Sequence, residues 1–179
     1  MIDPITTQRL FHQGVYIAIA MVILFVQLMP LSPSAGHFPG PDLTLALTLA
    51  WVLRRPEYVP ALSIVAIFLL QDMMFMRPPG LWTLLVLVGS EFLRARESSL
   101  RDLPFVLEWL VVAGVLCGMV LANRLVHALV MIPQPGLGTE LLRMLMTLLA
   151  YPVVVAATRF GVGLKRAAIG EVDALGHRR

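Results

Sequence analysis

Six apolar runs, separated by short polar segments or by proline and glycine, make up most of the chain. A run of about 20 apolar residues is long enough to cross the hydrocarbon core of a bilayer as a helix. The pattern therefore predicts an all-α integral membrane protein, one polytopic domain over residues 1–179 built as a six-helix transmembrane bundle. We expect helices at residues 11–31, 41–53, 58–76, 81–96, 103–132 and 137–160, and a cytoplasmic tail at 161–179.

Two of the runs allow more than one interpretation. The first could be a secretory signal peptide, but its apolar core is long for one and further apolar runs follow it, so we expect a retained helix. The second run is short, and a run of that length is often re-entrant or buried within protein. Pro152 lies within the last run, where a proline favours a kink.

Composition supports the membrane assignment. Hydrophobic residues make up 58% of the chain and charged residues 14%, and the mean hydropathy is +0.82. A soluble domain carries about a quarter charged residues and has far less apolar surface to hide. The net charge of +3 does not indicate nucleic-acid binding, because no basic stripe with interleaved aromatic residues is present.

The distribution of basic residues predicts the orientation. With six crossings and both termini in the cytoplasm, eleven of the fourteen basic residues lie on the inner side, namely Arg9, Arg54, Arg55, Arg94, Arg96, Arg101, Arg159, Lys165, Arg166, Arg178 and Arg179. A re-entrant second run would instead place Arg54 and Arg55 outside, against the positive-inside tendency. We therefore expect six crossings with both termini in the cytoplasm.

Polar residues gather near the outer ends of the expected helices. Ionisable groups at membrane depth are costly and usually face protein or water. The outer set consists of Asp42, Asp72, Arg77, Asn123, Arg124, His127 and Arg143. It predicts an outward-facing site for a partner or a ligand; the alternative is an interfacial set whose arginines reach the headgroups and whose acids cap helix ends.

Several smaller expectations concern packing and pairing. Glu140 and Arg143 lie three residues apart and could pair, while Glu91 and Glu108 are expected to pair with Arg94, Arg96 or Arg101. Gly114, Gly118 and Ala122 recur every four residues, a spacing typical of close helix packing within a chain or between subunits. The single cysteine, Cys117, is interpreted as a packing residue of the same helix.

Catalytic chemistry is absent from the sequence pattern. The four histidines are scattered, no metal-binding spacing or phosphate-binding glycine loop is present, and no serine lies in a Gly-x-Ser-x-Gly context. We expect a protein that is not an enzyme and needs no cofactor or metal.

The stretch from Pro39 to Arg94 carries a recognisable order of elements. Pro41-Asp42 opens an apolar run, Arg54-Arg55-Pro56-Glu57 forms a basic turn, a second apolar run ends in Gln71-Asp72, and Gly80-Leu81 opens the next. This order resembles the MreD family of rod shape-determining proteins. The chain departs from the family at Ala61 and Ala66, where members commonly carry glycine, and in its proline-rich segment at residues 76–80.

The resemblance implies a non-enzymatic scaffold of the cell-elongation complex that supports peptidoglycan synthesis and rod shape. It would bind an MreC-like protein directly, and through it RodA, a class B penicillin-binding transpeptidase and MreB, with membrane lipid around it. Charge reversal at Asp72 or Arg124 is then expected to weaken co-purification with the MreC-like protein. MreD proteins also look similar in fold to the S-components of energy-coupling-factor transporters, an analogy that carries no function by itself.

A second hypothesis is the substrate-binding membrane subunit of a transporter for a vitamin or another small molecule. That class tends to carry an Ala-x-x-x-Ala face on its first helix, whereas Ala18 and Ala20 lie on different faces here. A small molecule bound tightly to the purified protein would favour this hypothesis. An intramembrane enzyme is a third, weaker alternative.

Overall fold

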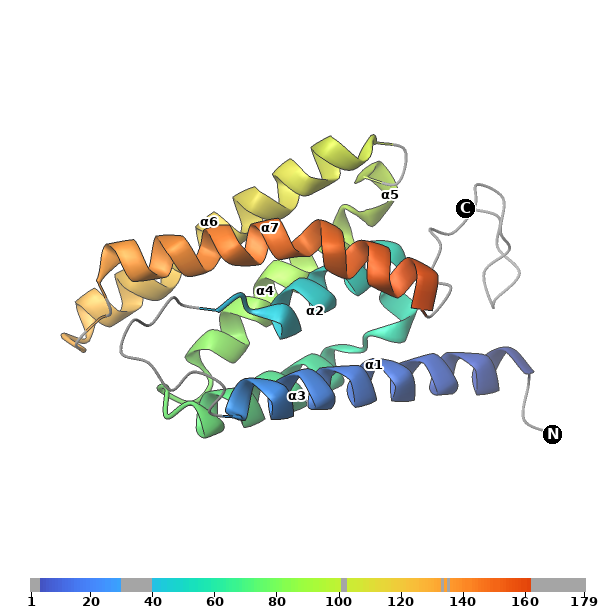
Figure 1. The fold of residues 1–179 in the computed structure, drawn as a ribbon, viewed down its shortest axis with the longest axis horizontal. Coiled ribbons are helices and arrows are strands. Elements are labelled where there is room, and N and C mark those ends of the chain that lie inside the picture. The colour runs from blue at the N-terminus through green and yellow to red at the C-terminus, as the bar shows by residue number, and fades with distance from the viewer. Residues whose placement is uncertain (1–3, 30–39, 101–102, 133, 135, 162–179) are drawn as a thin grey trace.

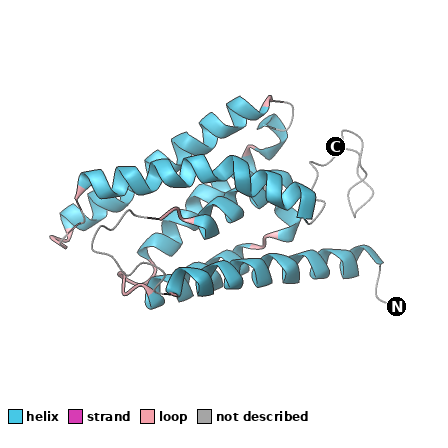
Figure 2. Cartoon of the chain, in the orientation of Figure 1, coloured by secondary structure: helices cyan, strands magenta, loops and turns pink. Residues whose placement is uncertain are grey.

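The computed structural model describes residues 4–29, 40–100, 103–132, 134 and 136–161. Within these residues the chain is all helical, with seven α-helices, one 3-10 turn and no strand (Figures 1 and 2). The helices are α1 (Pro4–Leu28), α2 (Leu43–Arg54), α3 (Ala61–Met74), α4 (Leu81–Ala95), α5 (Glu97–Leu100), α6 (Phe105–Leu129) and α7 (Leu137–Gly161), with the 3-10 turn η1 at Pro56–Tyr58. The predicted all-α class is confirmed.

Each of the six expected runs overlaps one of the longer helices, with shifted ends. The largest shift is at α1, which begins at Pro4 rather than at residue 11. Proline is well suited to the first turn of a helix, and hydropathy alone does not register a polar first turn. The one-turn helix α5 was not predicted because it is too short and polar to show a hydrophobic period. The loop at residues 30–39, Arg101 and the tail after Gly161 lie outside the described residues.

Three helical segments are long and apolar enough to cross a membrane: Thr7–Leu28, Phe105–Leu129 and Leu137–Gly161. Their outer faces expose large apolar side chains, among them Phe25, Leu125 and Val153. A water-soluble surface rarely presents so much contiguous apolar area, whereas a bilayer accommodates it. These features indicate a membrane protein.

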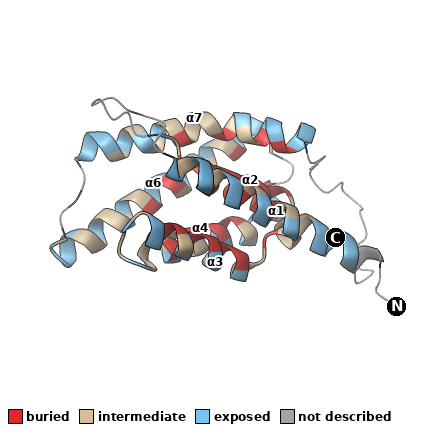
Figure 3. Ribbon diagram, turned by 60° about the horizontal axis from the view of Figure 1, so that its bottom comes forward, coloured by how far each residue is buried: buried red, intermediate tan, exposed pale blue. Residues whose placement is uncertain are grey.

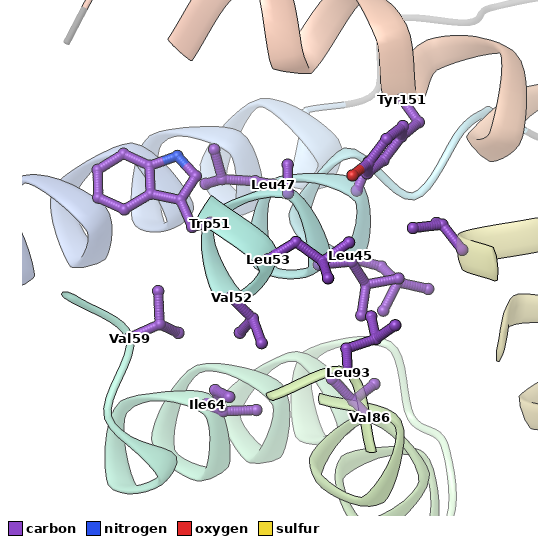
Figure 4. Close-up of a cluster of buried hydrophobic side chains, with 14 of the residues drawn as sticks. Leu45, Leu47, Trp51, Val52, Leu53, Val59, Ile64, Val86, Leu93 and Tyr151 are labelled. Carbon is purple, nitrogen blue, oxygen red and sulfur yellow. The ribbon is translucent and has the colours of Figure 1, made fainter. Parts of the chain in front are cut away.

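Helix α2 occupies the centre of the molecule. Every residue from Thr44 to Arg54 is buried, and α2 contacts α1, α4 and α7 (Figure 3). Its side chains point outward all round the helix, with Ile64 of α3, Val86 and Leu93 of α4 and Tyr151 of α7 on the surrounding elements (Figure 4). A helix that is apolar on all sides is expected to be enclosed by other helices.

Helix α1 is held against this centre by a small aromatic and polar contact. The Tyr16 hydroxyl shares a hydrogen bond of 2.9 Å with the Thr48 hydroxyl, and the Tyr16 ring packs against Trp51 at 5.6 Å between centroids. Tyr16 is fully buried, so its hydroxyl needs this partner.

Successive long helices run in opposite directions along the molecule (Figure 1). We name its two ends after the residues at the two ends of α2. The Asp42 end, on the left in Figure 1, carries the ends of α1, α3 and α6 and the starts of α2, α4 and α7. The Arg54 end carries the opposite termini of these helices. The polar residues discussed next lie at the Asp42 end.

Candidate functional site

A cavity of about 490 Å³ lies at the Asp42 end, between α6, α7, the start of α2 and the turn that joins α3 to α4. Its wall is part polar and part apolar. The polar residues are Asp42, Arg77, Asn123, His127, Thr139, Glu140, Arg143 and Thr147. The apolar residues include Leu45, Leu81, Trp82, Leu116, Val120 and Met144.

The structure brings together five of the seven residues of the predicted outer set: Asp42, Arg77, Asn123, His127 and Arg143 all line this cavity. Asp72 and Arg124 do not. These five residues come from four separate segments of the chain, and the antiparallel arrangement of the helices places their ends side by side (Figure 1). Whether they bind a partner or a ligand stays a prediction.

Arg77 reaches the wall because of how α3 ends. The Arg77 N–H donates to the Asp72 carbonyl at 3.0 Å and the Met76 N–H to the Met73 carbonyl at 3.3 Å, with Met76 at a φ of 49°. This bonding pattern, with one residue in the left-handed region, is a Schellman motif.

Helix α6 ends in the same way on the opposite wall. The Ile132 N–H donates to the His127 carbonyl at 3.0 Å, and Met131 has a φ of 58°. His127 itself is turned back on its helix, since its Nδ1–H donates to the Asn123 carbonyl at 2.8 Å. The other ring nitrogen is thereby left as an acceptor when the ring is neutral.

Asp72 is fully buried and stabilises the start of α4. Its Oδ2 accepts hydrogen bonds from the Thr83 hydroxyl at 2.8 Å, the Thr83 N–H at 3.2 Å and the Gly80 N–H at 3.1 Å. The first backbone N–H groups of a helix have no partner within the helix, and a carboxylate satisfies them. The structure therefore places Asp72 behind the turn that carries Arg77, and not on the outward surface that the sequence predicted for it.

Asp42 has a similar role at the start of α2 but also borders the cavity. Its Oδ1 accepts the Leu45 N–H at 3.0 Å, which is the hydrogen bond of an N-cap residue. Its own N–H donates to the Thr147 hydroxyl oxygen at 2.9 Å, and that hydroxyl donates to the Arg143 carbonyl at 2.8 Å. Asp42 thus connects α2 to the segment of α7 that carries Arg143.

Arg124 forms an ion pair with Glu140 that joins α6 to α7 beside the cavity. The pairing of Glu140 with Arg143 that their spacing allows is not formed, because the antiparallel approach of α6 presents Arg124 to the same carboxylate. Glu140 and Arg124 are both partly buried, with 17% and 23% of their side chains exposed, so the pair is not a fully solvated one.

Arg77 lies in a partly buried position beside a second cation. Its guanidinium stands over the Phe75 ring at 5.3 Å and the Trp82 ring at 5.9 Å, within the range of cation–π attraction. Burial lowers the pKa of Arg77, the neighbouring charge of Arg143 lowers it further, and the carboxylates of Asp42 and Asp72 oppose this shift. The two arginines therefore repel each other across the cavity.

The Arg54 end holds a buried network that sequence reasoning missed. Glu108 of α6 accepts a hydrogen bond from Arg54 at 2.9 Å and another from the Tyr151 hydroxyl at 2.7 Å. The sequence did not predict Arg54 as the ion-pair partner of Glu108, and Arg101, one of the arginines expected to pair with it, lies outside the described residues. The expected pairing of Glu91 with Arg94 is confirmed at 3.5 Å. No local spacing connects residues of α2, α6 and α7, so only the fold could reveal this contact.

The small-residue stripe of α6 borders a groove of about 440 Å³ between α4 and α6. A Cβ atom added to Gly114 or Gly118 would meet no atom within 4 Å, and Cys117 beside them is exposed. The close contact of these two helices instead involves Gly89 of α4, where an added Cβ would lie 2.9 Å from the Met119 Sδ. Packing of the stripe against another subunit stays a prediction.

No family model, no curated protein and no solved structure matches the chain. The resemblance to the MreD family therefore stays a prediction based on the order of elements between Pro39 and Arg94.

Proposed function

We propose that this chain is a non-enzymatic scaffold subunit of the MreD type in the bacterial cell-elongation complex. In this proposal it lies in the inner membrane, crosses it six times with both termini in the cytoplasm, and docks an MreC-like protein at the Asp42 end. RodA, a class B transpeptidase and MreB would be reached through that partner.

The observation that carries the proposal is the structural role of the two acids in the MreD-like stretch. Asp42 caps α2, and Asp72 caps α4 through Gly80 and Thr83. The Pro-Asp, Gln-Asp and Gly-Leu elements that define the resemblance are therefore the elements that fix where α2 and α4 begin. The order of motifs in the sequence has a physical reason in this fold, and the same turns present Arg77 to the cavity.

The direction of the helices supports six crossings. Each long helix runs opposite to the one before it (Figure 1). Helix α2 has only 12 residues, about 18 Å at 1.5 Å per residue, but its side chains are buried, so neighbouring helices shield it from lipid. Arg54, Arg55, Arg94, Arg96 and Arg159 lie at one end of these helices, which favours that end as the cytoplasmic one.

The docking proposal is tested by exchanging the charges of one ion pair. The double variant Arg124→Glu with Glu140→Arg keeps an attractive pair between α6 and α7 but reverses the charge pattern beside the cavity. We expect it to insert and fold like the parent chain, yet to lose co-purification with a co-expressed MreC homologue. Arg159→Glu, an exposed position at the far end of α7, is the matched control and should keep the complex.

Unchanged recovery of the complex with the exchanged pair would exclude this surface as the docking site. The cellular role has a separate test, depletion of the protein in its own rod-shaped host. Cells are expected to become spherical, and to regain rod shape with the parent chain. Depleted cells that stay rod-shaped would contradict the scaffold function itself.

The cavity favours a second candidate, a substrate-binding transporter subunit. Its volume of about 490 Å³ falls within the range of small-molecule sites, about 300–1,000 Å³. The wall includes the aromatic ring of Trp82, which lies within cation–π distance of the Arg77 guanidinium. Mass spectrometry of the purified protein tests this candidate, because a substrate-binding subunit should retain a soluble organic molecule at near one-to-one ratio.

A further inference from the structure

Two arginine side chains face the cavity without a carboxylate partner. Among the described residues, Arg77 and Arg143 make no side-chain ion pair or hydrogen bond, whereas Arg54, Arg94 and Arg124 all have acidic partners. Each guanidinium carries five N–H donors. The cavity wall therefore offers the N–H donors of two positively charged guanidinium groups.

The neighbouring carboxylates of Asp42 and Asp72 act on Arg77 through their charge, but neither forms an ion pair or hydrogen bond with Arg77 or Arg143. Asp42 accepts the Leu45 N–H, and Asp72 accepts the N–H groups that begin α4. Glu140, the remaining acid on the wall, is paired with Arg124. An anion from outside the chain would bind both arginines and remove the repulsion between them.

A phosphate group suits this pair of arginines better than a carboxylate does. The two oxygens of a carboxylate accept hydrogen bonds in one plane, whereas phosphate oxygens point in several directions and can accept from two guanidinium groups that approach from different sides. The arginines lie on different elements, the turn after α3 and the second turn of α7, so they approach the cavity from different directions.

The rest of the wall is apolar. Leu81, Leu116, Val120 and Met144 extend the lining away from the arginines, and α6 and α7 are both candidate membrane spans. Such a wall accommodates the apolar part of a ligand, with hydrocarbon lipid adjacent to it.

We propose that this cavity binds a phosphate group carried on an apolar body, with the phosphate held between Arg77 and Arg143. The ligand is either the headgroup of an anionic membrane phospholipid or a soluble phosphate ester. This inference is independent of the scaffold function, because it concerns the occupant of the cavity and not the protein partner.

The test uses the full chain, purified in detergent and stripped of lipid, with native mass spectrometry as the measurement. The probes are phosphatidylglycerol, diacylglycerol, which lacks the phosphate, oleate, which offers a carboxylate, and glycerol 3-phosphate as the soluble ester. We expect phosphatidylglycerol to be retained in preference to diacylglycerol and oleate. Retention of phosphatidylglycerol alone identifies a lipid headgroup, and binding of glycerol 3-phosphate that displaces it identifies a soluble ester.

Variants then locate the site. Arg77→Gln and Arg143→Gln should each weaken phosphatidylglycerol binding about tenfold or more, as expected for loss of a charged hydrogen-bond donor. Arg159→Gln is the matched control on the same helix and should change nothing. If Arg77→Gln does not fold, Arg143→Gln decides alone, because Arg143 is exposed. Equal binding of diacylglycerol or oleate, or an equal loss in Arg159→Gln, would overturn the proposal.

Discussion

Glu108 accepts a hydrogen bond from Arg54 at 2.9 Å although 54 positions separate the two residues in the sequence. Both side chains are almost wholly buried, with 2% and 7% exposed, and the Tyr151 hydroxyl donates to the same carboxylate oxygen at 2.7 Å. One carboxylate therefore connects α2, α6 and α7 at the Arg54 end. The cavity lies at the other end of the same helices, so the two polar clusters of this apolar chain occupy opposite ends of the core.

Replacing Glu108 with glutamine should destabilise the protein strongly. The change leaves the Arg54 guanidinium buried without a counter-charge, a loss that costs about 3–5 kcal/mol. Thermal unfolding in detergent measures the effect. Glu57→Gln is the matched control, because Glu57 pairs with Arg55 near the surface at 3.3 Å and should contribute about 1 kcal/mol or less. Similar melting temperatures for the two variants would contradict the central role of the buried pair.

Removing the Asp72 carboxylate should weaken the start of α4 without changing any residue that lines the cavity. Asp72→Ala leaves the Gly80 and Thr83 N–H groups without their acceptor, which costs about 1–2 kcal/mol. We expect a lower melting temperature, and retained capture of the MreC homologue at a temperature where the variant is folded. A folded Asp72→Ala protein that no longer binds that partner would show that Asp72 contributes to docking directly.

Two glycines should respond oppositely to the same substitution. Gly89→Ala introduces a Cβ that would lie 2.9 Å from the Met119 Sδ and 3.1 Å from the Val115 Cγ1, so α4 and α6 must separate or Met119 must move. Gly118→Ala meets no atom within 4 Å and gains about 1 kcal/mol of helix propensity. Unfolding temperatures should therefore fall for Gly89→Ala and hold or rise for Gly118→Ala. The reverse order would place the close contact of these helices at the stripe.

Fusions of alkaline phosphatase test the number of crossings. The enzyme is active only outside the cytoplasm, and six crossings place the junctions after Arg55 and after Arg101 inside. We expect both fusions to be inactive, and a fusion within the segment that joins α3 to α4, after Pro79, to be active. Activity at the Arg55 junction would mean that α2 does not carry the chain across the membrane.

Much of the fold was predictable because lipid exposure imposes a simple pattern. Apolar runs had to become helices, since no other single segment satisfies its backbone within a bilayer, and each of the six expected runs overlaps one α-helix. Prolines and glycines marked the breaks between them. The gathering of Asp42, Arg77, Asn123, His127 and Arg143 also followed from counting helix ends, because antiparallel helices bring alternate ends together.

Two of the charge pairs, unlike the local pair of Glu91 with Arg94, were decided by tertiary structure. Sequence spacing favoured Glu140 with Arg143 and Glu108 with its nearer arginines, but the structure pairs Glu140 with Arg124 and Glu108 with Arg54. A side chain responds to whatever lies beside it in space, and the rotation of each helix about its axis is set by packing, not by hydropathy. Packing directs Asp72 toward the start of α4 and leaves space for a Cβ atom at Gly118. It also places Arg77 and Arg143 on the wall of the cavity.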